Sequence, residues 1–460
     1  MSTPSTFEEW MAKADAYVKK IEADDDDETL EPEKAIELAT QAADAYAQAH
    51  ALKADDAHCL YQWGRALFTL AEFVDVEEEG AEEKLQRIDE AIEKLEQAEK
   101  LCPDNADMLY HLGQALSIKG STLIDELDDT ETGAPLLQRT IELYERAYPL
   151  REQQVAAGAV DASGDAYTQS HLVDMISAIV ESLTSLACLE TEEAKANAKF
   201  EEAFARIERA LPLVADRRAE LLQEWAAALQ VQANYLQDQQ MTLNNSLFDP
   251  AVAKLEESIA ADGTRTEAIV ELAELYLSMA NGVMAQAAMG DDDEEDEDEE
   301  DEEKVRAMID ARIAASEADI VSYYEKAVAQ FERALKVDPE NASLHLCLAD
   351  AVFARSQWAL PSSKDKESEL VAQAEKGYRT ALSLEKERDE SAIQLRLAQA
   401  LYFLKREDEC LAVMEQWKKN EEYMLALYEA DDILEREFLN FILEREDGDE
   451  DDDDEYEDAE

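Results

Sequence analysis

Residues 91–120 read AIEKLEQAEKLCPDNADMLYHLGQALSIKG, and this stretch decides the fold. Ala91, Leu95 and Ala98 lie on one helical face, and Pro103 ends that helix because proline has no backbone N–H to donate. A second apolar stripe with one small member follows: Leu109, Leu112, Gly113 and Leu116. Small residues on both stripes allow close approach, so the stretch predicts two antiparallel helices packed as a hairpin.

Four other stretches repeat this register: Ala42, Tyr46 and Ala49 with Leu60, Trp63, Gly64 and Leu67; Ala251 and Leu255 with Ile269, Leu272, Ala273 and Tyr276; Ala327, Phe331, Ala334 and Pro339 with Leu348, Ala349 and Val352; Ala374, Tyr378 and Ala381 with Leu397, Ala398 and Leu401. Chance amphipathic helices would reproduce one or two copies, not five with aligned small residues. The spacing matches the tetratricopeptide consensus. The sequence therefore predicts an all-α, tetratricopeptide-type helical solenoid with acidic disordered insertions and an acidic disordered tail.

The chain is expected to have three parts. Residues 1–34 form an N-terminal helix and an acidic linker, since Ser5 with Glu8, or Thr6 with Glu9, is spaced as a capping box. Residues 35–445 form the solenoid, whose core is one continuous strip, interrupted by a disordered acidic insertion at 290–304. Residues 446–460 form an acidic disordered tail. The N-terminus lacks the basic and apolar pattern of a signal peptide, so we expect an intracellular protein, nuclear, cytoplasmic or both.

Charge narrows the choice of partner. The chain has 111 acidic and 42 basic residues, a net charge of −69, with an unbroken acidic run at Asp291–Glu303. Such a field repels nucleic acid and anionic lipid and attracts basic proteins. We therefore expect a basic protein partner, with no direct nucleic-acid or membrane contact. The alternative is that the acidic tracts only keep the protein soluble as solvated spacers.

The sequence contains no motif that indicates catalysis. The five cysteines are widely separated without a CxxC pair, which favours buried, reduced thiols over a disulfide or zinc framework. The five histidines have no partner at metal-ligand or catalytic spacing, and no nucleotide-binding loop or catalytic triad is visible. We expect a non-enzymatic protein without a metal or cofactor.

The inner surface of a tetratricopeptide stack is formed by one face of each first helix. The positions on that face predict these partner-binding residues: Tyr61, Arg65, Asp107, Tyr110, Glu267, Glu274, Asp350 and Tyr402. An acidic and aromatic lining suits a basic, extended peptide through charge pairs and cation–π contacts. The positions that would carry the lysine, asparagine and arginine clamp for a C-terminal carboxylate hold Tyr61, Arg65, His111, Glu267 and Glu271 instead. This pattern disfavours an Hsp70 or Hsp90 co-chaperone of the clamp type. The alternative for each residue is burial by neighbouring helices.

A family resemblance rests on residues 56–73, DAHCLYQWGRALFTLAEF, and residues 267–280, EAIVELAELYLSMA. A charged insert at 77–83 and a helix with Ala98 before Pro103 lie between them, and an acidic insertion follows. In order and spacing these landmarks resemble the fungal translation-termination enhancers, a family that includes a nuclear negative regulator of a ribosomal-protein prolyl-hydroxylase. The basic, import-like segment with which that family opens has no counterpart in residues 1–20.

The resemblance implies an adaptor or chaperone linked to translation regulation, which binds the hydroxylase or its basic ribosomal client. Two alternatives remain open. Histone-binding tetratricopeptide chaperones also carry an acidic run inside a repeat, and a plain assembly scaffold would need no basic client.

Overall fold

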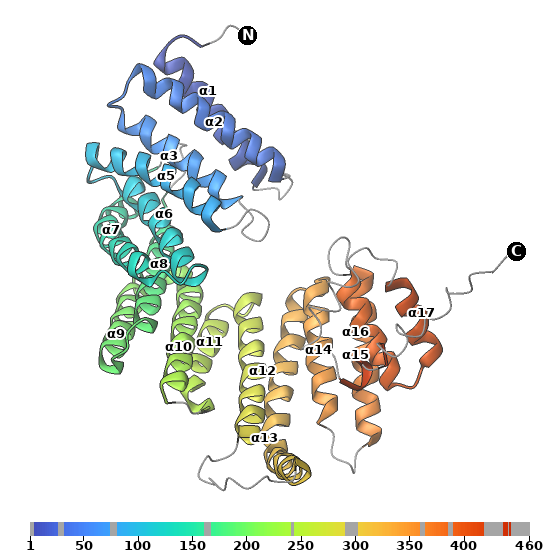
Figure 1. Ribbon diagram of the computed structural model, residues 1–460. Helices are drawn as coiled ribbons and strands as arrows, with labels where there is room; N and C mark the ends of the chain where they lie inside the picture. The colour runs from blue at the N-terminus through green and yellow to red at the C-terminus, as the bar shows by residue number, and fades with distance from the viewer. Residues whose placement is uncertain are drawn as a thin grey trace, which may run out of the picture. The chain divides into compact units, whose positions relative to one another are not determined.

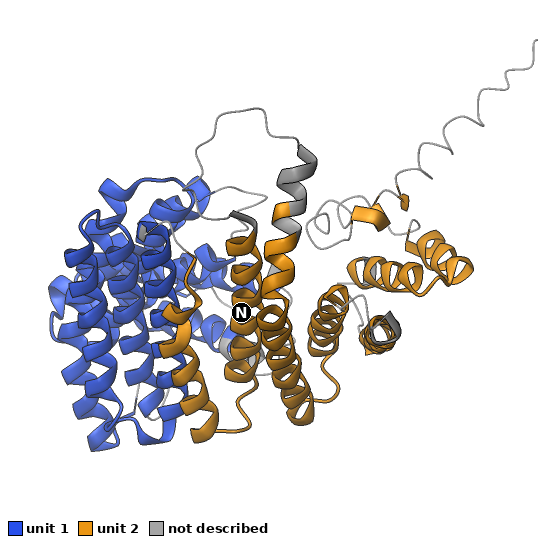
Figure 2. Ribbon diagram, turned by 90° about the horizontal axis from the view of Figure 1, so that it is seen from below, with its two compact units in different colours: residues 1–239 blue, residues 240–460 orange. Residues whose placement is uncertain are grey.

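A computed structural model describes residues 4–25, 32–73, 81–160, 167–240, 243–289, 302–358, 364–384, 390–417, 436–439 and 441–442. The described chain is almost entirely helical (Figure 1). It forms two compact units, residues 1–239 and residues 240–460 (Figure 2). The predicted all-α helical solenoid is confirmed.

Unit 1 is a series of antiparallel helices in which each packs on the next. Its helices are α1 (Phe7–Asp25), α2 (Pro32–Leu52), α3 (Ala57–Glu72), α5 (Ala81–Leu101), α6 (Ala106–Asp125), α7 (Thr130–Ala157), α8 (Gln169–Cys188), α9 (Glu193–Ala210), the 3-10 turn η1 (Ala215–Arg217) and α10 (Arg218–Gln240). The pairs α1–α2, α3–α5, α6–α7 and α8–α9 are its hairpins. Contacts of α6 with both α3 and α8 bring the first helices of successive hairpins together.

Unit 2 repeats this plan. It contains η2 (Asn245–Phe248), α11 (Asp249–Ala261), α12 (Thr266–Met289), α13 (Glu302–Val337), α14 (Ala342–Gln357), α15 (Lys364–Leu384), α16 (Glu390–Phe403) and α17 (Glu407–Trp417). The pairs α12–α13, α14–α15 and α16–α17 pack closely. The long helix α13 begins at Glu302, directly after the residues 290–301 that lie outside the described chain.

The repeat residues identified from sequence form the core. Ala91, Leu95 and Ala98 are fully buried on α5, and the bulky residues of α6 pack against them. The corresponding residues of unit 2, such as Ala374 and Tyr378, are buried in the same way. A cavity or an extra methylene at such a close-packed position is costly, which is why the small residues recur in register.

Three first helices begin at the same kind of cap. The side chains of Asp56, Asn105 and Asn341 accept hydrogen bonds from the backbone N–H three residues later. A short polar side chain at this position satisfies one of the free N–H groups of the first turn. The caps therefore set where α3, α6 and α14 begin, and with that which of their residues face inward.

The N-terminal capping box is present at α1. The Glu9 carboxylate accepts hydrogen bonds from the N–H groups of Ser5 at 2.7 Å and Thr6 at 3.2 Å, and the Glu9 N–H donates to the Thr6 hydroxyl at 3.2 Å. At the other end, Phe438 and Ile442 are buried in the core of unit 2, as expected for a closing segment. Residues 418–435 and the predicted tail at 446–460 lie outside the described residues.

Two helices, α8 and α12, are long and apolar enough to cross a membrane by length and composition. In the structure α8 buries most of its apolar residues in the core of unit 1, and α12 contributes Ile269, Leu272 and Ala273 to the core of unit 2. Their apolar character is therefore accounted for by packing between repeats.

Candidate functional site

A hollow of about 380 Å³ opens on the first-helix face of unit 1, and we call it the acidic hollow. Its lining comes mainly from α6 and α8: Lys84, Tyr110, Gln114, Ser117, Ile118, Ser121, Thr122, Asp125, Glu126, Tyr144, Ala178 and Glu181. Three of these residues are carboxylates, and Lys84 is the one basic residue in the set. The hollow is therefore suited to a cationic ligand.

Helical spacing explains how α6 and α8 present these residues. Tyr110, Gln114 and Ser117 follow each other by four and three residues, which places them on one face of α6. On α8, Asp174 and Glu181 occupy the same kind of spacing and are exposed, while the residues between them are mostly buried. Polar side chains thus remain on the one face that the core does not cover.

Two carboxylates at or near this hollow, Glu181 and Asp174, have raised pKa values. Although the Glu181 side chain reaches solvent, the surrounding helices partly desolvate its carboxylate, and this desolvation together with the nearby Asp125 carboxylate raises the pKa of Glu181. Burial likewise raises the pKa of Asp174, which lies close enough to Tyr110 to act on its hydroxyl electrostatically. Within the described part of the chain, neither Asp174 nor Glu181 forms an ion pair. A cation bound here would gain attraction without first breaking an existing pair.

Three of the predicted binding residues of unit 1 belong to a polar network around His111. Tyr61 is buried, and its hydroxyl lies 3.1 Å from His111 Nδ1. Arg65 lies over the Tyr61 ring, 5.9 Å from its centroid. The same His111 nitrogen lies 2.9 Å from the carbonyl oxygen of Asp107. Burial, with Arg65 nearby, lowers the pKa of His111 to about 3, so its ring is neutral at physiological pH.

The carboxylate of Asp107 is held by Arg151 and Tyr167. Arg151 Nη2 donates to it at 2.6 Å, and the Tyr167 hydroxyl donates at 2.7 Å. The Arg151 guanidinium also stacks on the Tyr167 ring at 3.9 Å. Burial alone would raise the pKa of Asp107, but these hydrogen bonds hold it below its ordinary value. Asp107 therefore links α6 to α7 and to the segment before α8.

Gly158 makes this connection possible. It ends α7 in the left-handed conformation, with φ of 61°, and donates its N–H to carbonyl groups of the last turn. The chain then returns so that the Tyr167 N–H donates to the Ala159 carbonyl at 3.0 Å. A glycine is favoured at this cap because other residues are strained at positive φ.

Tyr110 is the predicted residue that lines the acidic hollow. Its ring contacts His111 and Tyr144, with centroids 5.2 and 5.6 Å apart. It thus joins the inner network to the open surface. In the structure Tyr61, Arg65, Asp107 and Tyr110 lie close together. The first three contact other residues of unit 1, whereas Tyr110 lines the acidic hollow.

The predicted residues of unit 2 divide in the same way. Glu267 and Glu274 are exposed on α12, and burial raises the pKa of Glu274. Asp350 accepts a hydrogen bond from Tyr378 at 2.8 Å and lies 3.2 Å from Arg396 Nε. Tyr402 donates to Glu437 at 2.9 Å and packs on Phe441 at 4.7 Å. The two glutamates are therefore the predicted positions of unit 2 that remain open to solvent.

Sequence reasoning missed Asp174, Glu181, Arg151 and Tyr167. The repeat register weakens between α7 and α9, so the inward positions of α8 were not identified. The four-and-three spacing shared with α6 was the available signal. The partners of Asp107 had no such signal, because they lie 44 and 60 residues further along the chain.

The thiols differ in part from the expectation of buried cysteines. Cys59 and Cys410 are buried and Cys347 is half-buried, but Cys102 and Cys188 are exposed. Both exposed cysteines lie at a helix end, where the next helix covers less of the surface. Over the described residues, no group of three His, Cys, Asp or Glu side chains could hold a metal ion.

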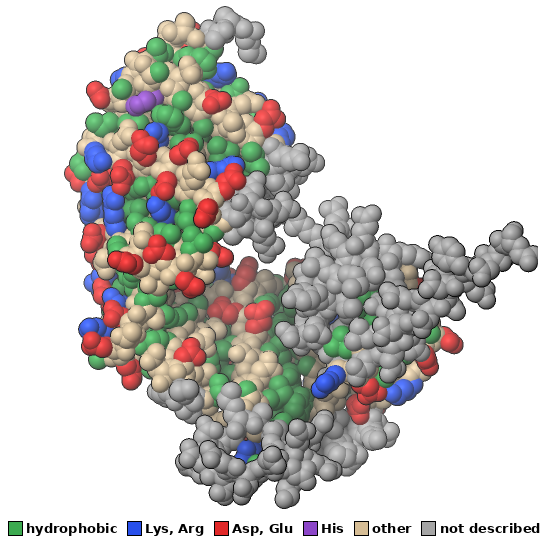
Figure 3. Space-filling view, viewed as in Figure 1, with side chains coloured by type: hydrophobic (Ala, Val, Ile, Leu, Met, Phe, Trp, Pro, Cys, Tyr) green, Lys and Arg blue, Asp and Glu red, His purple; other side chains and the backbone are tan. Residues whose placement is uncertain are grey.

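Figure 3 shows acidic side chains spread over unit 1, with Lys and Arg gathered along one of its edges. Ion pairs join successive second helices of unit 1: Arg139 with Glu96, Arg146 with Glu99, and Arg206 with Glu145. The basic residues thus lie largely on the second helices, while the acidic hollow lies between first helices. The two faces of unit 1 carry different chemistry.

Comparison with known proteins agrees with this geometry. Two segments match the TPR repeat family model. They are residues 83–120, which cover α5 and most of α6, and residues 323–355, which cover the end of α13 and most of α14. No curated protein matches the chain. TPR hairpins in both units are consistent with a protein-interaction fold, since stacked repeats create extended binding surfaces.

Several solved structures are similar over most of their length. The Schizosaccharomyces pombe nuclear import adaptor Nro1 is 14% identical, with 87% of this chain and 98% of that one covered and a TM-score of 0.32. A circular tandem repeat protein is 17% identical, with 93% and 97% covered and a TM-score of 0.30. The TPR2AB domain of yeast Sti1 is 15% identical, with 70% and 98% covered and a TM-score of 0.18. At this similarity none of them carries an argument about function.

Proposed function

We propose that the protein is a non-enzymatic adaptor that holds a lysine- and arginine-rich segment of a client protein in the acidic hollow. One observation carries the proposal. Glu181 and Asp174 have raised pKa values and form no ion pair among the described residues; Glu181 lines the hollow together with Tyr110, and Asp174 lies close enough to Tyr110 to act on its hydroxyl. A bound cation would relieve the unfavourable charge that burial creates there.

The shape of the hollow suits a long cationic side chain. Lysine and arginine bury their methylene stems on apolar surface while the charged group reaches polar partners. Ile118, Ala178 and the Tyr144 ring offer apolar surface to the stem, and Glu181 and Asp125 can accept from the charged group. The Tyr110 ring adds a face for a cation–π contact.

We propose a ribosomal protein or its hydroxylase as the client, in the nucleus, the cytoplasm or both, with a role in translation regulation. The support is the resemblance to the translation-termination enhancers together with the acidic surface. A histone is the alternative basic client, and a scaffold without a basic client is the remaining alternative.

Binding of a basic peptide tests the proposal. A fluorescein-labelled 16-residue peptide of alternating Lys, Arg, Ala and Gly is titrated with the full chain, and the anisotropy is recorded. We expect saturable binding that the double change of Glu181→Gln and Asp125→Asn weakens about tenfold or more, because charge-assisted hydrogen bonds contribute about 1.5–3 kcal/mol each. Glu142→Gln, an exposed carboxylate on α7, is the matched control and should bind like the native protein.

Two outcomes would contradict the proposal. One is an absence of binding near physiological salt, and the other is equal weakening by the control and the hollow variants, which would indicate a diffuse field without a site. Labelled tails of ribosomal proteins and histones, compared in the same assay, then decide between the two client classes.

The pH dependence of peptide binding is a further prediction. The cation binds the ionised carboxylates, so protonation competes with it. Because the pKa of Glu181 and of Asp174 is raised, affinity should start to fall at a pH above the ordinary carboxyl range of about 4. In the Glu181→Gln variant the affinity should fall less as the pH is lowered, because one of the titrating carboxylates is absent. Anisotropy titrations between pH 4.5 and 7.5, at constant ionic strength, measure it, and identical pH profiles for the two proteins would be the contrary result.

A further inference from the structure

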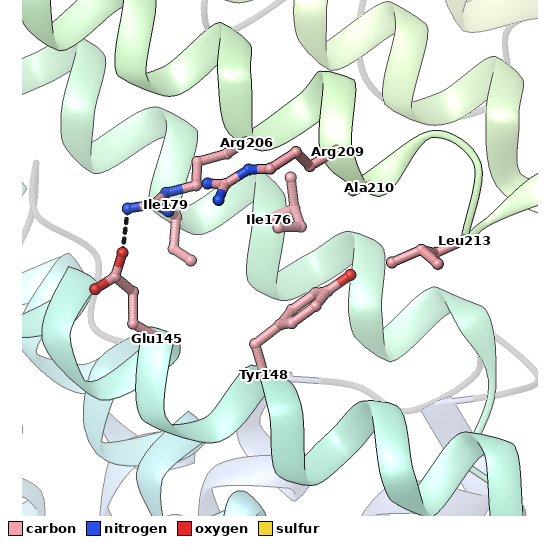
Figure 4. Close-up of a pocket in the computed structure, with 8 residues that line it drawn as sticks. All are labelled: Glu145, Tyr148, Ile176, Ile179, Arg206, Arg209, Ala210 and Leu213. Atoms are coloured by element: carbon pink, nitrogen blue, oxygen red, sulfur yellow. Dashed lines mark hydrogen bonds and ion pairs between the residues drawn. The ribbon is translucent and has the colours of Figure 1, made fainter.

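Unit 1 has a second hollow, on the side of α7, α8 and α9, with a volume of about 380 Å³ (Figure 4). We call it the arginine hollow. Ile176 and Ile179 of α8 form a buried apolar floor, and Leu213, which follows α9, lies at the rim with 45% of its surface exposed. An apolar group placed between the exposed leucine and the apolar floor would bury apolar surface, which favours binding.

The polar groups of this hollow are incompletely satisfied. The Tyr148 hydroxyl is enclosed and has no hydrogen-bond partner among the residues that the structure describes, and Figure 4 shows it pointing into the hollow toward Leu213. Buried hydroxyl groups normally have a partner, so this one is available to a ligand. Burial raises the pKa of Tyr148, which keeps the hydroxyl protonated and able to donate.

The two arginines of the hollow differ in whether a carboxylate pairs with them. Arg206 forms ion pairs with Glu145 and Glu202, so its charge is compensated. Arg209 donates from Nε to the Ala205 carbonyl at 3.2 Å, and no described carboxylate pairs with it. Figure 4 places its guanidinium beside that of Arg206, over the apolar floor. In a chain with a net charge of −69, this is a local site for an anionic group.

We propose that the arginine hollow binds a small amphipathic organic anion, in which an aromatic or branched apolar body carries one carboxylate, sulfonate or phosphate group. The body would cover Ile176, Ile179 and Leu213, the anionic group would pair with Arg209, and the Tyr148 hydroxyl would donate to an oxygen of the ligand. The volume lies in the range of small-molecule sites and is filled by one fused ring system with a substituent. The arginine hollow and the acidic hollow share no lining residue, so their ligands do not compete for the same side chains.

The test uses 8-anilinonaphthalene-1-sulfonate as the probe, titrated into the full chain and followed by its fluorescence. We expect saturable binding of one probe per chain. Arg209→Gln should weaken it about tenfold, the effect of losing a hydrogen bond to a charged group, and Tyr148→Phe about fivefold. Neutral naphthalene should fail to displace the probe, whereas naphthalene-2-sulfonate should displace it.

Arg333→Gln, an exposed arginine of unit 2, is the matched control and should leave the titration unchanged. Circular dichroism establishes that each variant keeps its helical content. Non-saturable fluorescence, or native affinity in both Arg209→Gln and Tyr148→Phe, would overturn the proposal. The basic peptide of the acidic hollow should not compete with the probe, so failure at one site is distinguished from failure at the other.

Discussion

Replacing Asp107 with leucine is expected to lower the free energy of unfolding of unit 1 by about 3–5 kcal/mol. The change leaves Arg151, whose side chain is only 2% exposed, as an uncompensated charge in the protein interior. It also removes the acceptor of the Tyr167 hydroxyl. Amide hydrogen exchange in α6 and α7 of the full chain measures the loss where it arises, because the two units need not unfold together.

A double-mutant cycle separates the effect of losing the Asp107–Arg151 ion pair from the effect of disturbed packing. Arg151→Met combined with Asp107→Leu should recover most of the stability, because two apolar groups can replace a buried pair at little cost. Asp89→Leu, which breaks the exposed Lys119–Asp89 pair, is the control and should cost at most about 1 kcal/mol. A double variant as unstable as Asp107→Leu alone would contradict this account of the pair.

The same pair predicts a pH dependence. The pKa of Asp107 is held below its ordinary value in the folded protein, so its stabilisation is fully present above the unfolded pKa of about 3.9 and is lost as the pH falls through the lower folded value. The difference in stability between the native protein and Asp107→Leu should therefore shrink as the pH falls below about 4. If the stability difference between the native protein and Asp107→Leu stayed constant in acid, the charge of Asp107 would not be the source of the stabilisation.

Replacing Gly133 with valine is expected to destabilise unit 1 by about 3 kcal/mol, at the upper end of overpacking effects. Gly133 of α7 faces Gly120 of α6, with no side chain between the two backbones. A Cβ atom on Gly133 would lie 2.6 Å from Ile124 Cγ1 and 2.7 Å from the Gly120 carbonyl oxygen. The side chain of Ile124 can move, but the backbone of Gly120 cannot do so without separating the two helices.

Amide hydrogen exchange in α6 and α7 of the full chain measures this effect, with exchange in α11 and α12 followed for the control. Gly263→Ala is the control, because a Cβ atom there would have no neighbour closer than 3.7 Å, and a change within about 0.5 kcal/mol is expected. The loss of stability in Gly133→Ala should lie between the losses in Gly133→Val and Gly263→Ala. Native stability in Gly133→Val would show that α6 and α7 can separate freely at this point.

Much of the fold was predictable because its determinants are local. The positions Ala91, Leu95 and Ala98 recur at the helical period, and the caps at Asn105 and Asn341 precede their helices directly in sequence. The candidate site was predictable in part. The sequence predicts an acidic, aromatic surface on the first-helix face, and Tyr110 of that prediction lines the acidic hollow.

The sequence by itself determined the repeat register, the all-α fold and the acidic character of the surface, since helical periodicity and charge can be read without knowing which helices meet. Only the tertiary structure decided which inward positions remain open. Tyr61 on α3 and Asp107 on α6 occupy inward positions like that of Tyr110, yet His111 contacts the Tyr61 hydroxyl, and Arg151 and Tyr167 donate to the Asp107 carboxylate. The physical reason is that periodicity fixes the direction of a side chain, whereas its partners depend on which distant segments pack against that face.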